Sequence, residues 1–106
     1  MKYTKLLSAI VLIFLMGCGG ASKETIESGA LLYTKCSECH GIDGTTKALG
    51  KSAVLNGQSK VDIKNELKAY KAGTRNEAGM GAWKQGMMAP FSDADIDALA
   101  AYISTL

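Results

Sequence analysis

The stretch Cys36-Ser37-Glu38-Cys39-His40 decides what this chain of 106 residues can be. Two thiols three positions apart, followed at once by an imidazole, form the C-x-x-C-H pattern that is typical of covalent haem attachment. Thiols at this spacing can reach the two vinyl groups of one porphyrin and form thioether bonds. The histidine after the second thiol then lies beneath the iron and supplies its proximal nitrogen. We therefore expect one c-type haem on Cys36 and Cys39, with His40 as an axial iron ligand.

Other uses of a C-x-x-C pair fit this sequence less well. In an oxidising compartment the pair could form a disulfide, and a thioredoxin-like redox pair would have a βαβ pattern around it, which is missing here. Zinc would need further Cys or His ligands, and His40 is the only histidine in the chain. The single histidine also limits the chain to one haem and excludes iron ligation by two of its own histidines.

The N-terminal segment has the features of a secretory signal. Lysines precede an almost continuous apolar run over residues 6–16. About 7–15 apolar residues suffice for a signal, whereas a membrane span needs about 20. The run ends in Leu15-Met16-Gly17-Cys18, which resembles the lipobox of bacterial lipoproteins. We expect cleavage before Cys18 and lipid on this residue; an ordinary signal, cleaved among residues 19–22, is the alternative.

Removing the signal changes the charge balance of the chain. Loss of Lys2 and Lys5 takes the 12 basic residues to 10, which equals the 10 acidic residues. A near-neutral chain without a basic cluster argues against nucleic acid as a partner. We expect residues 1–17 to be the signal peptide, residues 18–28 a short tether and residues 29–106 one small domain. A domain of this size is often completed by a disulfide, a metal or a cofactor.

The segments on either side of the motif have the periodicity of helices. Apolar residues over 26–33 predict an amphipathic helix that leads into the motif. A second helix is expected over residues 60–72, between a serine N-cap and a glycine stop, and a third begins after Ser92. Residues 41–57 are rich in Gly, Thr, Ser and Lys, which predicts a loop over one haem edge. No stretch alternates strongly enough to predict a sheet. The expected fold is all-α.

The chain beyond the signal resembles class I cytochromes c, in particular the small bacterial monohaem carriers called cytochrome c553. The resemblance is carried by residues 29–33, 36–44, 56–58 and 92–106. It implies the class I cytochrome c fold, in which helices and loops surround one covalent haem. In that family the first and last helices cross beside the haem, with a glycine at the crossing and an aromatic ring across it. Gly29 and Tyr102 occupy the matching places.

The second axial ligand of the iron is where this chain departs from the family. The family places a methionine shortly before the last helix, at the position that is Lys84 here. We favour Met88, because the string Met87-Met88-Ala89-Pro90 looks like the ligand loops of other class I cytochromes. Met87 and Met80 are the alternatives, since in a helix both would share the face of position 84. Lys84 itself and an open iron site complete the possibilities.

The resemblance implies an electron carrier and not an enzyme. With His40 and a methionine on the iron, no place remains for oxygen or a small-molecule substrate, and the expected activity is outer-sphere transfer of single electrons. The expected partners are redox proteins. The expected location is the periplasmic side of a bacterial membrane, held by lipid on Cys18, or the soluble periplasm without lipid. The alternatives are a small-ligand sensor or weak peroxidase with an open iron, and a fixed haem subunit of a larger oxidoreductase.

Overall fold

The computed structural model describes residues 21–106, and the predicted signal peptide and Cys18 lie outside this range. Its four longer helices are α2 (Lys23–Tyr33), α4 (Lys60–Ala72), α5 (Gly81–Met88) and α6 (Asp93–Ile103). The connections contain the one-turn helix α3 (Ser37–His40) and two 3-10 turns, η1 (Ala48–Gly50) and η2 (Glu77–Gly79). Across residues 21–106 there is no strand, and the all-α expectation is confirmed. None of the helices within that range is long and apolar enough to span a membrane.

Local capping explains the bounds of α4 and α6. The side chain of Ser59 accepts a hydrogen bond from a backbone N–H in the first turn of α4, and the helix ends where Gly73 takes a left-handed conformation. At the start of α6, Ser92 and Asp95 each accept a hydrogen bond from the other's backbone N–H, which is a complete capping box. The second helix therefore has the bounds that the sequence predicts.

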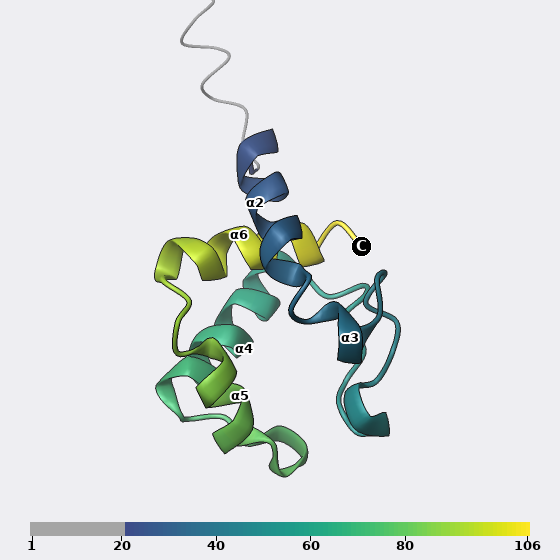
Figure 1. The fold of residues 1–106 in the computed structure, drawn as a ribbon, viewed down its shortest axis with the longest axis vertical. Coiled ribbons are helices and arrows are strands. Elements are labelled where there is room, and N and C mark those ends of the chain that lie inside the picture. The colour runs from purple at the N-terminus through teal and green to yellow at the C-terminus, as the bar shows by residue number, and fades with distance from the viewer. Residues whose placement is uncertain (1–20) are drawn as a thin grey trace, which may run out of the picture.

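Helix α2 begins earlier than the predicted domain. Its N-cap is Ser22, whose hydroxyl oxygen accepts a hydrogen bond from the amide of Thr25 at 3.2 Å. Residues 23–28, which the sequence assigns to the tether, are therefore helical. They project beyond the rest of the fold at the upper end of α2 (Figure 1).

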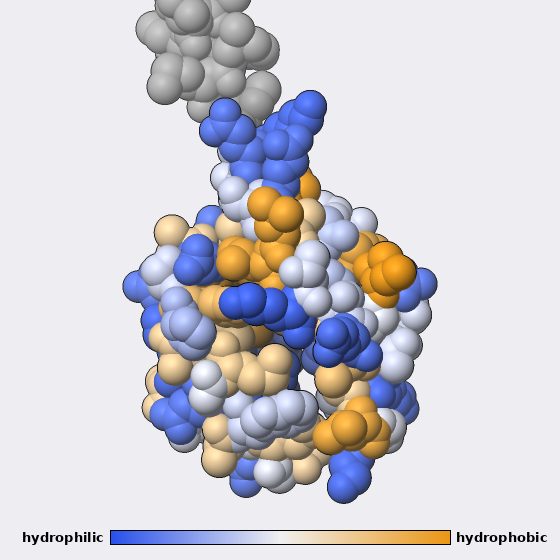
Figure 2. Space-filling view, viewed as in Figure 1, coloured by the Kyte–Doolittle hydropathy of each residue, from blue (hydrophilic) through white to orange (hydrophobic). Residues whose placement is uncertain are grey.

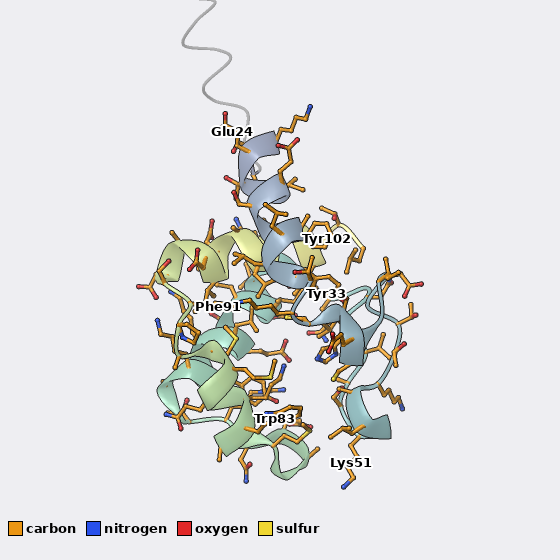
Figure 3. The ribbon with its side chains drawn as sticks, viewed as in Figure 1. Glu24, Tyr33, Lys51, Trp83, Phe91 and Tyr102 are labelled. Atoms are coloured by element: carbon orange, nitrogen blue, oxygen red, sulfur yellow. The ribbon has the colours of Figure 1, made fainter. Side chains whose placement is uncertain are left out.

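Helices α2 and α6 cross one another (Figure 1), and Gly29 lies at the crossing. A Cβ at this position would collide with the carbonyl oxygen of Ala98 and come within 2.7 Å of the Cβ of Tyr102. Glycine is therefore required for the two backbones to approach so closely. One turn further along α2, the ring of Tyr33 lies 5.5 Å from that of Tyr102, tilted by 49° (Figure 3). The structure thus places Gly29 and Tyr102 at the helix crossing, as the resemblance implies.

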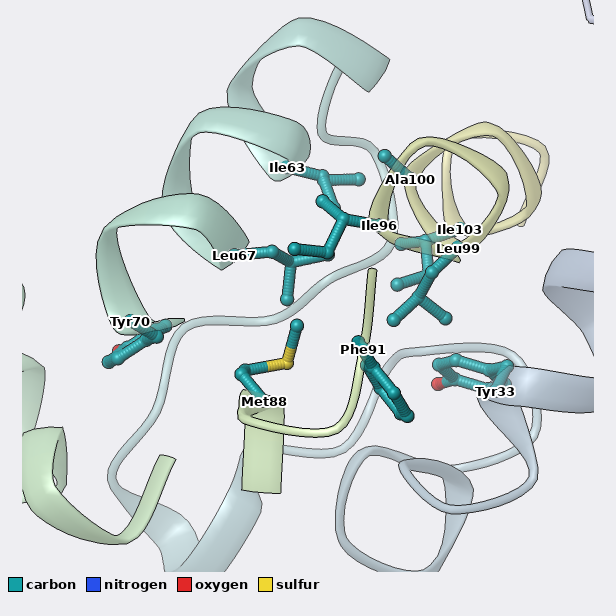
Figure 4. Close-up of a cluster of buried hydrophobic side chains, with 10 residues drawn as sticks. All are labelled: Tyr33, Ile63, Leu67, Tyr70, Met88, Phe91, Ile96, Leu99, Ala100 and Ile103. Atoms are coloured by element: carbon teal, nitrogen blue, oxygen red, sulfur yellow. The ribbon is translucent and has the colours of Figure 1, made fainter. Parts of the chain in front are cut away.

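One apolar cluster joins α2, α4, α5 and α6 (Figure 4). Its buried members are Tyr33, Ile63, Leu67, Tyr70, Met88, Phe91, Ile96, Leu99, Ala100 and Ile103. Burying an aliphatic side chain fully contributes about 1.5–3 kcal/mol, so these side chains hold the four helices together. Within the described residues, α3 and the loop that follows it supply no member of the cluster. The core is therefore one-sided, and the two thiols and the imidazole lie at its open edge.

Candidate haem site

A single turn of helix brings the two thiols and the imidazole together. The turn follows α2 directly, because the amide of Cys36 donates a hydrogen bond to the carbonyl of Tyr33 at 2.8 Å. The amides of Cys39 and His40 then donate to the carbonyl of Cys36 at 3.2 and 3.0 Å. Residues three and four apart on a helical turn lie on one face. Cys36, Cys39 and His40 accordingly line the same cavity, and the two thiols do not form a disulfide.

The cavity beside Cys36 and His40 separates α3 from the helical core. Figure 2 shows a hollow in the middle of this face of the molecule. It holds about 590 Å³ of space free of protein atoms, part of it open to solvent. The opposite wall is apolar and comes from α4 and α6. The aliphatic side chains of that wall are Ile63, Leu67, Leu99 and Ile103.

The imidazole of His40 is buried, and one of its nitrogens lacks a hydrogen bond within the described residues. It is only 5% exposed, and its Nδ1 makes no hydrogen bond to any of residues 21–106. Burial, together with the positive charge of Lys84, lowers the pKa of His40 to about 4. The imidazole is therefore neutral near pH 7, and the neutral form is the one that ligates metals. A buried polar nitrogen without a hydrogen-bond partner needs an explanation, and a group bound in the adjoining cavity would provide one.

Hydrogen bonds, more than apolar packing, hold the loop that follows His40. The hydroxyl of Tyr33 donates to the carbonyl of Gly41 at 2.6 Å. Burial, as the main cause, raises the pKa of Tyr33 to about 12. The hydroxyl therefore keeps the proton that it donates. Further along, the carbonyl of Gly44 accepts hydrogen bonds from the amides of Leu55 and Asn56 at 3.0 and 2.9 Å. These contacts fold the loop back beside the motif.

The methionines proposed for the second axial position occupy different environments. Met88 is 3% exposed and belongs to the core cluster, where it lies between Tyr70 and Phe91 (Figure 4). It lines a cavity with Cys36, but neither of the two cavities that His40 lines. Met80 and Met87 line one cavity together with His40, and Met87 is 37% exposed. The Met88 prediction thus stays a prediction, and its side chain is engaged in packing.

Arg75 is a site residue that the sequence alone does not single out. Its guanidinium lines the cavity beside Cys36 and His40 and pairs with Glu66 of α4 at 3.2 Å and Glu77 of η2 at 3.6 Å. It also lies 5.3 Å above the ring of Tyr70. Its Nε is buried and has no hydrogen-bond partner among the described residues. No motif marks this arginine, because its partners come from separate elements that only the fold brings together.

Covalent haem is the prosthetic group that uses two thiols and the adjacent imidazole together, and on an all-helical fold this site defines a c-type cytochrome. Residues 26–106 match the family model described as "Cytochrome c", and the chain belongs to the cytochrome c family. It therefore carries one haem c and transfers electrons, and it is not an enzyme. The predicted fold, cofactor and activity are confirmed.

The relatives of this chain include cytochrome c-553 proteins of two bacteria. It is 42% identical over 75 residues to cytochrome c-553 of Helicobacter pylori strain J99, covering 71% of this chain and 74% of that protein. It is 33% identical over 91 residues to cytochrome c-553 of Nitratidesulfovibrio vulgaris strain Miyazaki F, covering 82% and 84%. The crystal structure of reduced cytochrome c4 from Pseudomonas stutzeri superposes with a TM-score of 0.72 at 26% identity. The match covers 85% of this chain and 52%, about half, of the cytochrome c4 chain.

Proposed function

We propose that Cys36 and Cys39 bind one haem through thioether bonds, that His40 ligates its iron, and that the protein passes single electrons between redox proteins outside the cytoplasm. The observation that carries the assignment is the cavity shared by the two thiols and the buried imidazole, whose Nδ1 has no partner among the described residues. Beside it lies a second cavity, which Cys36 and His40 line together with the apolar wall. When bound, haem supplies the one-electron ferric and ferrous couple.

The residues around the cavity have separate tasks in this proposal. The thiols of Cys36, the N-cap of α3, and of Cys39 within it would fix one edge of the porphyrin to the chain, so that the cofactor could not dissociate in either oxidation state. The aliphatic side chains of α4 and α6 exclude water from its face, which favours outer-sphere transfer with little rearrangement. Arg75 retains one unpaired donor, Nε, for a carboxylate in the cavity. Together with Glu66 and Glu77, it also holds the segment that precedes α5.

The thiol assignment is tested by denaturing the purified protein. Haem on wild-type protein should stay with the polypeptide through acid and organic extraction, because thioether bonds survive unfolding. The double variant with Cys36→Ser and Cys39→Ser should lose all haem in the same extraction. Covalent haem retained by the double variant would overturn the assignment.

Carbon monoxide separates the carrier from a sensor or peroxidase. A carrier has both axial positions of its iron filled by the protein, so the reduced protein should bind carbon monoxide slowly and incompletely at neutral pH. Rapid and complete binding would indicate an open site and favour the sensor. Co-purification after mild detergent extraction distinguishes a free carrier from a fixed subunit of a larger complex.

We also propose that lipid on Cys18 anchors the chain at the periplasmic side of a bacterial membrane. Support comes from the apolar run that ends in Leu15-Met16-Gly17-Cys18. Two or more acyl chains give stable anchoring, where a single chain is marginal. Cys18→Ser should move the protein from the membrane fraction to the soluble fraction or leave an uncleaved precursor. Identical, soluble behaviour of wild type and variant would contradict the anchor and leave the haem assignment untouched.

A further inference from the structure

Helix α5 has an inward face that contains one lysine. Gly81 and Met88 are buried at the two ends of this helix, and Lys84 lies between them at helical spacing. Lys84 is half-buried, whereas Trp83 on the adjacent face is 52% exposed. A lysine on the solvent face of a helix would be unremarkable, but this one lies on the face that α5 turns toward the interior.

Lys84 borders the space in which the haem is proposed to lie. Three cavities adjoin this space, and Cys36 and Lys84 are the two described residues that line all three. Lys84 lines both of the cavities that His40 lines. The two residues come from different sides, since His40 ends α3 and Lys84 projects from α5. An iron atom held by His40 in this space therefore has Lys84 among the residues across from it.

The ammonium group of Lys84 is not used elsewhere in the described chain. It forms no ion pair or side-chain hydrogen bond among residues 21–106, and its close polar contact is with the face of the Tyr70 ring at 5.4 Å. The two carboxylates in the same cavity, Glu66 and Glu77, are both paired with Arg75. The amine of Lys84 is therefore free of any ion pair within the described residues that binding to a metal would have to break.

The neighbouring methionines satisfy fewer of these conditions. Met88 is engaged in the core and shares no cavity with His40. Met87 is more exposed than Lys84, and Met80 lies before the first residue of α5. Each of these methionines lines one cavity together with His40, whereas Lys84 lines two.

We propose that the ε-amine of Lys84 is the second axial ligand of the haem iron. This inference rests on the proposed attachment of haem through Cys36, Cys39 and His40. On ligation the ammonium group releases one proton to solvent, and the lone pair of Nζ forms the sixth bond to iron in place of water. Two nitrogen ligands in place of nitrogen and thioether favour ferric iron, so the protein is a carrier of lower potential than a His/Met cytochrome. The iron remains closed to substrates.

Spectroscopy of the purified, oxidised holoprotein tests the ligand. Wild type should be low-spin and lack the weak far-red band of sulfur-to-iron charge transfer that a bound methionine gives. Lys84→Met should acquire that band, and its potential should rise. Lys84→Arg is the matched control, because a guanidinium keeps the charge but does not lose its proton to bind iron. It should become high-spin and bind carbon monoxide rapidly. Met80→Leu, Met87→Leu and Met88→Leu should retain the wild-type spectrum.

Several outcomes would overturn the inference. A far-red band in wild type that disappears in one of the three leucine variants would identify that methionine as the ligand. A high-spin wild type would mean an open site. A low-spin spectrum that is unchanged in Lys84→Arg would reduce Lys84 to a charged neighbour of the haem. If Lys84→Met fails to fold, the presence or absence of the far-red band in wild type and the spin state of Lys84→Arg still test whether Lys84 is the ligand. Absence of covalent haem from wild type is a different result, since it rejects the proposed function itself.

Discussion

The two sides of the cavity are built by different means. The helical half, which consists of α2, α4, α5 and α6, contains every buried member of the apolar cluster. The motif half, residues 34–58, buries only His40, Gly44 and Ala48 and exposes two apolar side chains, Ile42 to 84% and Leu49 to 66%. Its order comes from α3 and from the backbone hydrogen bonds that close its loop. One half is held by its own core, and the other lacks one.

This difference assigns a structural role to the cofactor. The apolar wall of α4 and α6 faces the motif half across the cavity, so a porphyrin bound there, as proposed, would supply apolar surface to both halves at once. A small domain of this kind is often completed by a cofactor that acts as part of its core. We therefore expect the haem to matter much more for the motif half than for the crossing of α2 and α6.

The largest expected effect follows from removing the haem. In the double variant with Cys36→Ser and Cys39→Ser, amide hydrogen exchange should accelerate in both halves, because the core loses one of its walls. The amides of Thr46, Leu55 and Asn56 should lose protection by roughly 100-fold or more, because their loop has backbone hydrogen bonds but no buried apolar core of its own. Amides of α6 near Ala98 should retain part of theirs. Equal loss in both halves would show that the helical half has no independent stability.

The next largest effect is expected at the close contact between α2 and α6. Gly29→Ala inserts a methyl group against the backbone of Ala98, and overpacking of this kind costs about 3 kcal/mol. The free energy of unfolding of the holoprotein, measured with denaturant, should fall by that amount. Gly86→Ala is the control, because a Cβ at this helical glycine meets nothing within 4 Å. It should stabilise the protein by about 0.5–1 kcal/mol. Equal effects of the two substitutions would contradict the tight crossing.

The same two halves differ in how far the sequence predicts them. The bounds of α4 and the start of α6 follow from serine caps and a glycine stop, which act within one or two turns of chain. The thiols and the imidazole follow from one local motif. The environments of Lys84 and Arg75 do not follow from local sequence, because they depend on how α5 and the segment before it pack across the cavity from α3. For the same reason, sequence periodicity alone cannot tell a methionine in the core from one beside the iron.

A smaller effect is expected where the two halves are joined. Tyr33→Phe removes the hydroxyl that donates to the carbonyl of Gly41, the hydrogen bond between α2 and the motif loop. Loss of such a bond costs about 1 kcal/mol, and the holoprotein should unfold at correspondingly lower denaturant concentration. Tyr102→Phe is the matched control, because the hydroxyl of Tyr102 makes no hydrogen bond within residues 21–106. A cost as large in Tyr102→Phe would mean that the ring contact, and not the hydrogen bond to the loop, is being measured.

The smallest effect concerns an exposed contact within the helical half. Asp97 of α6 accepts a hydrogen bond from Lys64 of α4 at 3.1 Å, and Lys60 lies 3.4 Å away. The hydrogen bond from Lys64 contributes most to lowering the pKa of Asp97 below its ordinary value of 3.8. A group whose pKa is lowered by folding stabilises the protein above its unfolded value and loses that contribution as the pH falls through its folded value. Because Asp97 is 38% exposed, Asp97→Asn should cost only about 0.5 kcal/mol at pH 7. The difference between wild type and variant should shrink as the pH is lowered below 3.8 and as salt is added. A cost of several kcal/mol that persists in high salt would mean that this surface contact, and not the apolar cluster beneath it, holds α4 against α6.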